Sequence, residues 1–196
     1  DIFIVTEEFF LPNVSLDVYV KMNRPFYPNF SQEVLERCLQ DFELPLSLNL
    51  NELSMGQKKK AYMSFALATG TKYLFMDEPT NGLDIPSKSQ FRKVIANNMT
   101  DERMLIISTH QVHDIESLLD HIVILNQNNL LLDASVADIC EDYSFEYRTP
   151  AEMDDTVLYA EPTLQGNAVI AKRKAGSRET QMNLELLFNA AINGKL

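Results

Sequence analysis

The sequence is poor in cysteine, in positive charge and in long apolar runs, and each shortage excludes a class of protein. Two cysteines, Cys38 and Cys140, are too few for a disulfide framework, which favours a reducing cytoplasmic setting. The 17 lysines and arginines face 28 acidic residues, and the net charge of −11 repels nucleic acid and anionic lipid. No apolar run approaches the ~20 residues that cross a bilayer. If the protein works at a membrane, another polypeptide supplies the membrane part.

Short apolar runs alternate with segments of helical periodicity along the first two-thirds of the chain. Such alternation predicts an α/β fold with helices layered around a mainly parallel sheet. The predicted buried strands are residues 2–5, 73–76, 104–107, 122–125 and 130–132. The predicted helices begin near Ser31, near Ser54, at residue 87 and at residue 112, and the last of them covers residues 112–119.

The pattern of apolar residues changes near residue 145. Short alternating pieces at residues 157–159 and 168–170 precede one last apolar helix near residues 181–192. We therefore predict a core over residues 1–143 and a small α+β appendix over residues 144–196.

Asp77 and Glu78 directly follow the apolar run 73–76. Acids at the carboxyl end of a buried parallel strand lie at the edge where such sheets bind ligands. One carboxylate can bind Mg²⁺ through its water shell, and the other can orient or deprotonate an attacking water. Taken alone, the dipeptide favours the simpler interpretation of a solvated turn.

Two further segments change that balance. Leu-Ser-Met-Gly-Gln occupies residues 53–57, Asp-Glu-Pro-Thr-Asn-Gly-Leu-Asp occupies 77–84, and Ser-Thr-His occupies 108–110. In this order and spacing, the three segments resemble the ATP-binding-cassette (ABC) ATPase family over roughly residues 2–134. The resemblance implies a P-loop-NTPase-like parallel sheet with flanking helices and a short helical subdomain, here about residues 9–53.

The resemblance also implies roles for single residues. It makes Asp77 the Walker B carboxylate that binds Mg²⁺ through water, Glu78 the catalytic carboxylate and His110 the switch histidine beside the γ-phosphate. Asp84 falls in the D-loop. A lone histidine at a strand end would be interpreted as locally satisfied, which is the interpretation we keep for His113 and His121.

Residues Ser54, Met55, Gly56 and Gln57 match the signature loop, which in the family faces the nucleotide bound by a partner subunit. Because the loop opens a helix, the backbone N–H groups of Ser54 and Gly56 are expected to face phosphate oxygens. Met55 departs from the family pattern, in which a second glycine is commoner.

Glu7 falls where the family usually has the Q-loop glutamine, and a glutamate there could still sense or bind the magnesium ion. Glu8 is the alternative for this position. A solvated acidic pair after a strand is the other interpretation of the same two residues.

A glycine-rich loop ending in Gly-Lys-Ser/Thr, which grips phosphates, is absent from the sequence. In the family this Walker A loop lies upstream of the Q-loop, so we expect that Asp1 begins past it and that the 196 residues alone do not hydrolyse ATP. We also expect that the strands at 104–107 and 122–125 either flank further polypeptide or pair with each other directly.

The resulting hypothesis is an ATP-hydrolysing subunit of an ABC transporter, a homodimer that binds ATP and Mg²⁺ and drives a membrane permease from the cytoplasmic face. The segment Arg-Pro-Phe-Tyr-Pro-Asn-Phe at 24–30 looks like exporter-type subunits of the ABC-2 group. Two alternatives remain open: a soluble ABC ATPase acting on DNA or ribosomes, and a non-catalytic regulatory module. The transported substrate cannot be inferred, because its specificity lies in the permease.

Overall fold

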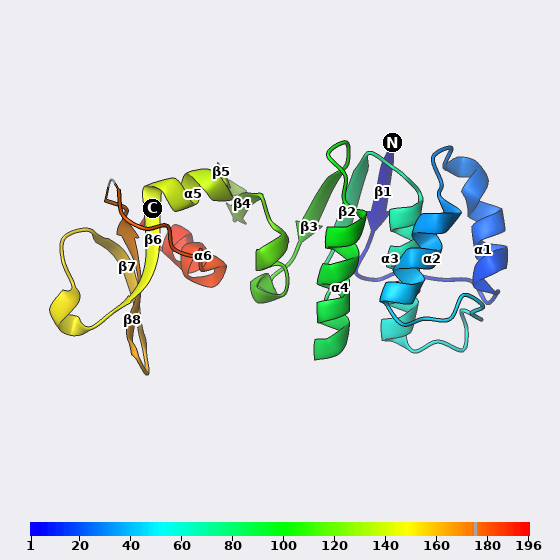
Figure 1. The fold of residues 1–196 in the computed structure, drawn as a ribbon, viewed down its shortest axis with the longest axis horizontal. Helices are drawn as coiled ribbons and strands as arrows, with labels where there is room; N and C mark the ends of the chain where they lie inside the picture. The colour runs from blue at the N-terminus through cyan, green and yellow to red at the C-terminus, as the bar shows by residue number, and fades with distance from the viewer. Residues whose placement is uncertain (175) are drawn as a thin grey trace. The chain divides into compact units, whose positions relative to one another are not determined.

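The computed structural model describes residues 1–174 and 176–196 (Figure 1). Contacts within the chain divide it into two compact units, Asp1–Asp114 and Ile115–Leu196. Residues 115–143 belong to the second of these units. The predicted division into a core over residues 1–143 and an appendix over residues 144–196 stays a prediction. No helix in the described parts of the chain is long and apolar enough to span a membrane.

The first unit is built on three parallel strands, as the apolar runs predict. They are β1 (Ile2–Val5), β2 (Tyr73–Asp77) and β3 (Met104–Ser108), and their order in the sheet is β1-β2-β3. Tyr73 pairs with Ile2 on one side and with Met104 on the other, and the register stays unbroken to the end of the strands. The carboxyl ends of β2 and β3 therefore meet at one edge.

Helices of the first unit begin at side chains that accept a backbone N–H of the first turn. These capped helices are α1 (Leu16–Asn23), α2 (Gln32–Asp41), α3 (Met55–Ala68) and α4 (Ile85–Asn98). A short 3-10 turn, η1 (Arg24–Phe26), follows α1 without a side-chain cap. The caps are Ser15, Ser31, Ser54 and Asp84. The helices near Ser31 and Ser54 begin as predicted, whereas the sequence analysis missed α1.

One face of the sheet packs against α3 through a cluster of aromatic rings. Phe65 of α3 is buried, and its ring centroid lies 5.0 Å from that of Tyr19 and 6.0 Å from that of Phe3. Tyr27 and Phe30 complete the cluster at 5.9 and 5.6 Å. This cluster fixes α3 against β1 and against the helical segment between residues 9 and 53. Figure 1 shows α3 and α4 drawn across the same side of the three strands.

The opposite face of the sheet is apolar and exposed. Ile2, Ile4, Met104 and Ile106 are 58%, 54%, 54% and 40% exposed, whereas Val5, Leu74 and Met76 on the helical face are almost completely buried. Parallel strands are normally apolar on both faces because both are covered. The composition of these strands thus fits a second covering layer, which the described residues of this unit do not supply.

The second unit contains two antiparallel sheets. A hairpin of β4 (His121–Asn126) and β5 (Asn129–Ser135) turns at Gln127 and Asn128, both with positive φ, and leads into α5 (Val136–Asp142). The strands β6 (Tyr143–Arg148), β7 (Val157–Thr163) and β8 (Gly166–Lys172) form a sheet of order β6-β8-β7, against which α6 (Leu184–Ile192) packs. The predicted strands at 122–125 and 130–132 and the α+β character of the C-terminal part are confirmed.

One sequence prediction about this region is wrong. Residues 112–119 form two separate 3-10 turns, η2 (Val112–Asp114) and η3 (Glu116–Leu118), because Arg92 takes the carbonyl oxygen of Asp114 where the chain passes between units. Of the two outcomes expected for the strands at 104–107 and 122–125, direct pairing is not observed, since β3 lies in the sheet of order β1-β2-β3 and β4 pairs with β5. That β3 and β4 flank further polypeptide stays a prediction.

The two faces of the sheet should differ in their sensitivity to truncation. Leu74→Ala leaves a cavity in the helical face, and we expect it to lower the free energy of unfolding by about 2–5 kcal/mol. Ile4→Ala removes a half-exposed side chain from the other face, and we expect a loss below about 1 kcal/mol. Urea denaturation of both variants of the 196-residue chain measures this. Equal losses would show that the second face is covered as well.

Candidate functional site

The carboxyl ends of β2 and β3 are tied together by hydrogen bonds. Asp77 lies opposite Ser108 in the sheet, and the Ser108 hydroxyl donates to Asp77 Oδ1 at 2.6 Å. The backbone N–H of Glu78 donates to the carbonyl oxygen of Ser108 at 2.8 Å. The register of the sheet therefore brings together two of the three motifs that the sequence analysis singled out.

The Glu78 carboxylate makes several hydrogen bonds at this edge of the sheet. Its Oε2 accepts the hydroxyl of Thr109 at 2.8 Å, and its Oε1 accepts the backbone N–H of His110 at 2.9 Å. Nδ1 of His110 lies 2.7 Å from the same Oε1. Because an ionised carboxylate only accepts, Nδ1 carries the proton in this pair, and Nε2 is left to face other groups. The Glu78 side chain is 14% exposed and that of His110 is 73% exposed.

The turn after Glu78 collects polar groups from four segments. Asn81 donates through Nδ2 to Glu7 Oε1 at 2.6 Å and accepts through Oδ1 from Gln111 at 3.3 Å. Its backbone oxygen accepts the ammonium of Lys59 at 2.9 Å. The structure thus connects Glu7, at the end of β1, to the acidic turn, which favours Glu7 over Glu8 for the role assigned to the Q-loop position.

The start of α3 is closed by a reciprocal capping box. Ser54 Oγ accepts the N–H of Gln57 at 3.3 Å, and Gln57 Oε1 accepts the N–H of Ser54 at 3.0 Å. The N–H of Ser54, expected to face phosphate, is therefore already in use. Among the described residues no group accepts from the N–H of Met55 or Gly56, so these two remain the donors available at the helix start.

Gly56 faces the turn after Glu78 without being squeezed by it. A Cβ added there would meet Leu83 Cδ2 at 3.8 Å and the Gly82 oxygen at 3.9 Å, both ordinary contacts. Packing within the unit thus does not require glycine at this position. The prediction that Gly56 admits a phosphate oxygen from outside the chain stays open.

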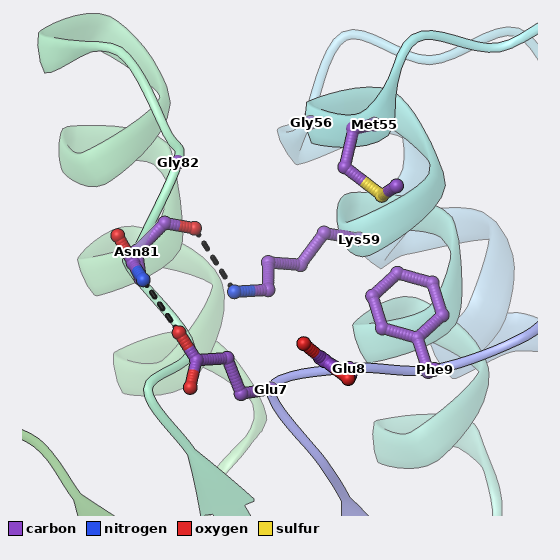
Figure 2. Close-up of a pocket in the computed structure, with 8 residues that line it drawn as sticks. All are labelled: Glu7, Glu8, Phe9, Met55, Gly56, Lys59, Asn81 and Gly82. Atoms are coloured by element: carbon purple, nitrogen blue, oxygen red, sulfur yellow. Dashed lines mark hydrogen bonds between the residues drawn. The ribbon is translucent and has the colours of Figure 1, made fainter.

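A pocket of ≈ 400 Å³ lies between the end of β1, the start of α3 and the turn after Glu78. Figure 2 shows its lining side chains: Glu7, Glu8, Phe9, Met55, Gly56, Lys59, Asn81 and Gly82. Phe9 stacks on Tyr62 of α3 with ring centroids 5.0 Å apart. Residues of the signature match, the Q-loop candidate and the segment leading to Asp84 therefore share one cavity, whereas Glu78 and His110 are not among its lining residues.

Carboxylate oxygens of Asp77 and Glu7 are ligands that Mg²⁺ prefers. The described residues contain no group of three His, Cys, Asp or Glu side chains placed to bind a metal ion by themselves. Proteins commonly bind magnesium through one or two carboxylates, waters and the phosphates of a nucleotide.

Sequence reasoning missed four residues of this network: Lys59, Asn81, Thr109 and Gln111. Thr109 and Asn81 lie inside the recognised motifs, but their spacing does not say which atoms they bind. Lys59 is one of three consecutive lysines at 58–60, and nothing in the sequence shows that it is the buried one.

No family model matches the chain. The zinc uptake system ATP-binding protein ZurA of Listeria innocua is 29% identical over 110 residues, 55% of this chain and 42% of that protein. The ABC transporter ATP-binding protein YtrB of Bacillus subtilis is 25% identical over 125 residues, 63% of this chain and 43% of that protein. The chain is homologous to the ATP-binding subunits of ABC transporters. It spans less than half the length of these two relatives.

Solved structures of similar fold match the chain. An ATP-binding subunit of an ABC transporter matches with a TM-score of 0.56 at 23% identity, over 70% of this chain and 60% of that one. A cobalt transport ATP-binding protein matches with a TM-score of 0.61 at 18% identity, over 100% of this chain and 71% of that one. The predicted P-loop-NTPase-like α/β fold is confirmed.

Asp84, which we predict to lie in a D-loop, has a structural role that can be measured. Its Oδ1 accepts the N–H of Ser87 at 2.9 Å and caps α4, and the side-chain and backbone hydrogen bonds from Ser87 lower the pKa of its carboxyl group. A depressed pKa means that the charged cap stabilises the fold above the unfolded pKa of about 3.9. This stabilisation is lost as the pH falls through the folded-state value.

We therefore expect Asp84→Ala to lower the thermal unfolding midpoint at pH 7, while Asp84→Asn, which keeps a capping oxygen, lowers it less. On acidification from pH 7 to 3, the thermal unfolding midpoint of the parent should fall by more degrees than that of Asp84→Asn, because asparagine does not titrate. Calorimetric scans of the three proteins across this pH range measure both effects. Parallel pH profiles for the parent and Asp84→Asn would contradict the assignment.

Proposed function

We propose that the protein is the ATP-binding and ATP-hydrolysing subunit of an ABC transporter and couples nucleotide-driven dimer closure to a membrane permease. The observation that carries the proposal is the Glu78 carboxylate, fixed at the carboxyl edge of the sheet by Thr109 and His110 beside Asp77. Such an edge is where open α/β sheets bind their ligands. A carboxylate fixed there, and still partly exposed, can orient and deprotonate a water.

Each residue then has a defined task. Glu78 orients the attacking water and accepts its proton, while His110 and Thr109 keep the carboxylate in one position. Asp77 and Glu7 provide oxygens for magnesium, which when bound would neutralise charge on the phosphates. The amides of Met55 and Gly56, at the positive end of α3, suit an anion presented by a second subunit. These assignments need a phosphate-gripping loop, which the 196 residues do not contain.

The transporter role is favoured over the two alternatives by charge and by the relatives. A net charge of −11 opposes binding to DNA or ribosomes, and the relatives reported above are named as transporter components. The proposal places the protein at the cytoplasmic face of the membrane, bound to a permease. The names of two relatives bear on what such subunits transport. One is part of a zinc uptake system, and another, YfeB of Yersinia pestis, is part of a chelated iron transport system. The exporter-type assignment from residues 24–30 stays a prediction.

The central test is Glu78→Gln in the protein expressed from its complete gene. We expect steady-state phosphate release at saturating ATP to fall by about 10²–10⁴-fold, because a general base is lost, with ATP binding nearly intact. Glutamine keeps the size of the side chain: its single amide oxygen can still accept from the His110 N–H, and its amide nitrogen can donate to the Thr109 hydroxyl. The isolated 196-residue chain, expected to be inactive, serves as a blank. Turnover within threefold of the parent would remove Glu78 from the catalytic role.

The dimer is tested by Ser54→Arg in the same protein. The larger side chain would fill the space into which the partner's phosphate must fit, so ATP-driven dimerisation should disappear while nucleotide binding by the monomer is unchanged. Light scattering of a Glu78→Gln background, with and without ATP, measures the effect. Ser54→Ala is the matched control, because it removes the capping oxygen without adding bulk and should still dimerise. An undiminished dimer for Ser54→Arg would show that this loop does not face a partner.

A further inference from the structure

Lys59 is a buried lysine whose ammonium group binds two backbone oxygens of the acidic turn. The residue is only 5% exposed, and Nζ donates to the oxygen of Glu78 at 2.8 Å and to that of Asn81 at 2.9 Å. Figure 2 shows the side chain reaching from α3 across the pocket to Asn81. The neighbouring Lys60 bonds instead to Gln90 of α4. One side chain of the signature helix is thus tied to the catalytic segment.

The turn that Lys59 contacts has an unusual backbone. Glu78 has a φ of 44°, in the left-handed region that side chains other than glycine seldom adopt, and Gly82 follows with a φ of 77°. The turn is closed by the bonds from Asn81 N–H to the Glu78 oxygen at 3.2 Å and from Leu83 N–H to the Thr80 oxygen at 3.1 Å. A strained conformation of this kind persists only where its surroundings fix it, and the Lys59 ammonium binds both ends of the Glu78–Asn81 segment.

The acidic side chains around Lys59 stabilise its positive charge against the cost of burial. Burial lowers its pKa, whereas the carboxylates of Glu7, Glu78 and Asp77 act in the opposite direction. A buried ammonium is costly unless it is paired and hydrogen-bonded, and here the partners are two carbonyl oxygens and the acids of the site itself. Lys59 therefore lies where it can affect the conformation of Glu78 through the backbone of the turn.

We propose that Lys59 is a positioning residue for ATP hydrolysis: it fixes the backbone of Glu78 in the left-handed conformation and makes the placement of this carboxylate depend on the position of α3. The inference rests on the proposed function, since it assigns a task at the same site. It adds that a displacement of the signature helix moves the catalytic carboxylate through one side chain.

The first experiment compares Lys59→Met with Lys60→Met in the protein expressed from its complete gene. Methionine keeps the length and the apolar stem of lysine but cannot donate. We expect Lys59→Met to lower kcat by about 10- to 100-fold with KM for ATP within about twofold, because a misplaced reacting group costs up to ~10². Lys60→Met, whose lost bond lies outside the turn, should leave both constants within about twofold. An unchanged kcat for Lys59→Met overturns the proposal.

The second experiment reads the turn directly. Hydrogen–deuterium exchange followed by mass spectrometry should show faster exchange in a peptide covering residues 78–84 for Lys59→Met, with the peptide over β3 unchanged. The proposal is overturned, even if kcat falls, if Lys59→Met exchanges no faster than the parent in residues 78–84. It is also overturned if the β3 peptide shows the same increase as residues 78–84. Where Lys59→Met does not fold, Lys59→Gln, a shorter side chain that still donates, takes its place and should show a smaller effect in the same direction.

The two proposals fail separately. If Glu78→Gln abolishes hydrolysis and Lys59→Met does not lower kcat, the proposed function stands and the role of Lys59 is wrong. If Glu78→Gln retains turnover, the protein hydrolyses ATP without this carboxylate, and the catalytic role of Glu78 and the positioning role of Lys59 both fail. If the complete parent protein does not release phosphate, the proposed function itself fails.

Discussion

The alignment of β2 with β3 is the constraint on which the candidate site depends. Because Asp77 lies opposite Ser108, the residue after each strand end reaches its counterpart on the other, and Glu78 meets Thr109 and His110. A slip by one residue would turn every side chain of the strand to the other face and separate these groups. The helical face of β2, with Leu74 and Met76 almost completely enclosed, and the half-buried Leu105 and Ile107 of β3 favour that register through packing. Core packing thus determines the position of the carboxylate.

Much of this arrangement can be predicted from the sequence. The strands β1, β2 and β3 follow from short apolar runs, and the starts of α2 and α3 follow from Ser31 and Ser54 before periodic apolar positions. Asp77 and Glu78 follow from their place at the end of an apolar run, whereas His110 follows only from the resemblance to the ABC ATPase family. The structure places Asp77 opposite Ser108, so that Glu78 and His110 lie at one edge of the sheet.

Other features depend on contacts that no local pattern encodes. The break of the predicted helix at 112–119 arises where Arg92, some 20 residues earlier, binds the Asp114 oxygen. The capping box at Ser54 takes an N–H that the signature motif alone would offer to a ligand. Lys59 is buried because the turn after Glu78 folds over it, and Lys58 and Lys60 have the same intrinsic properties. Each of these required the tertiary structure.

The geometry at Gly56 separates what the fold needs from what the proposed activity needs. The second residue of α3 has room for a methyl group, and glycine is a weaker helix former than alanine by about 1 kcal/mol in a helix interior. Helix stability alone would therefore favour alanine at this position. The packing of the chain on itself does not explain the glycine, whereas the close approach of a phosphate in the proposed activity does, so a substitution that stabilises the helix is expected to impair that activity.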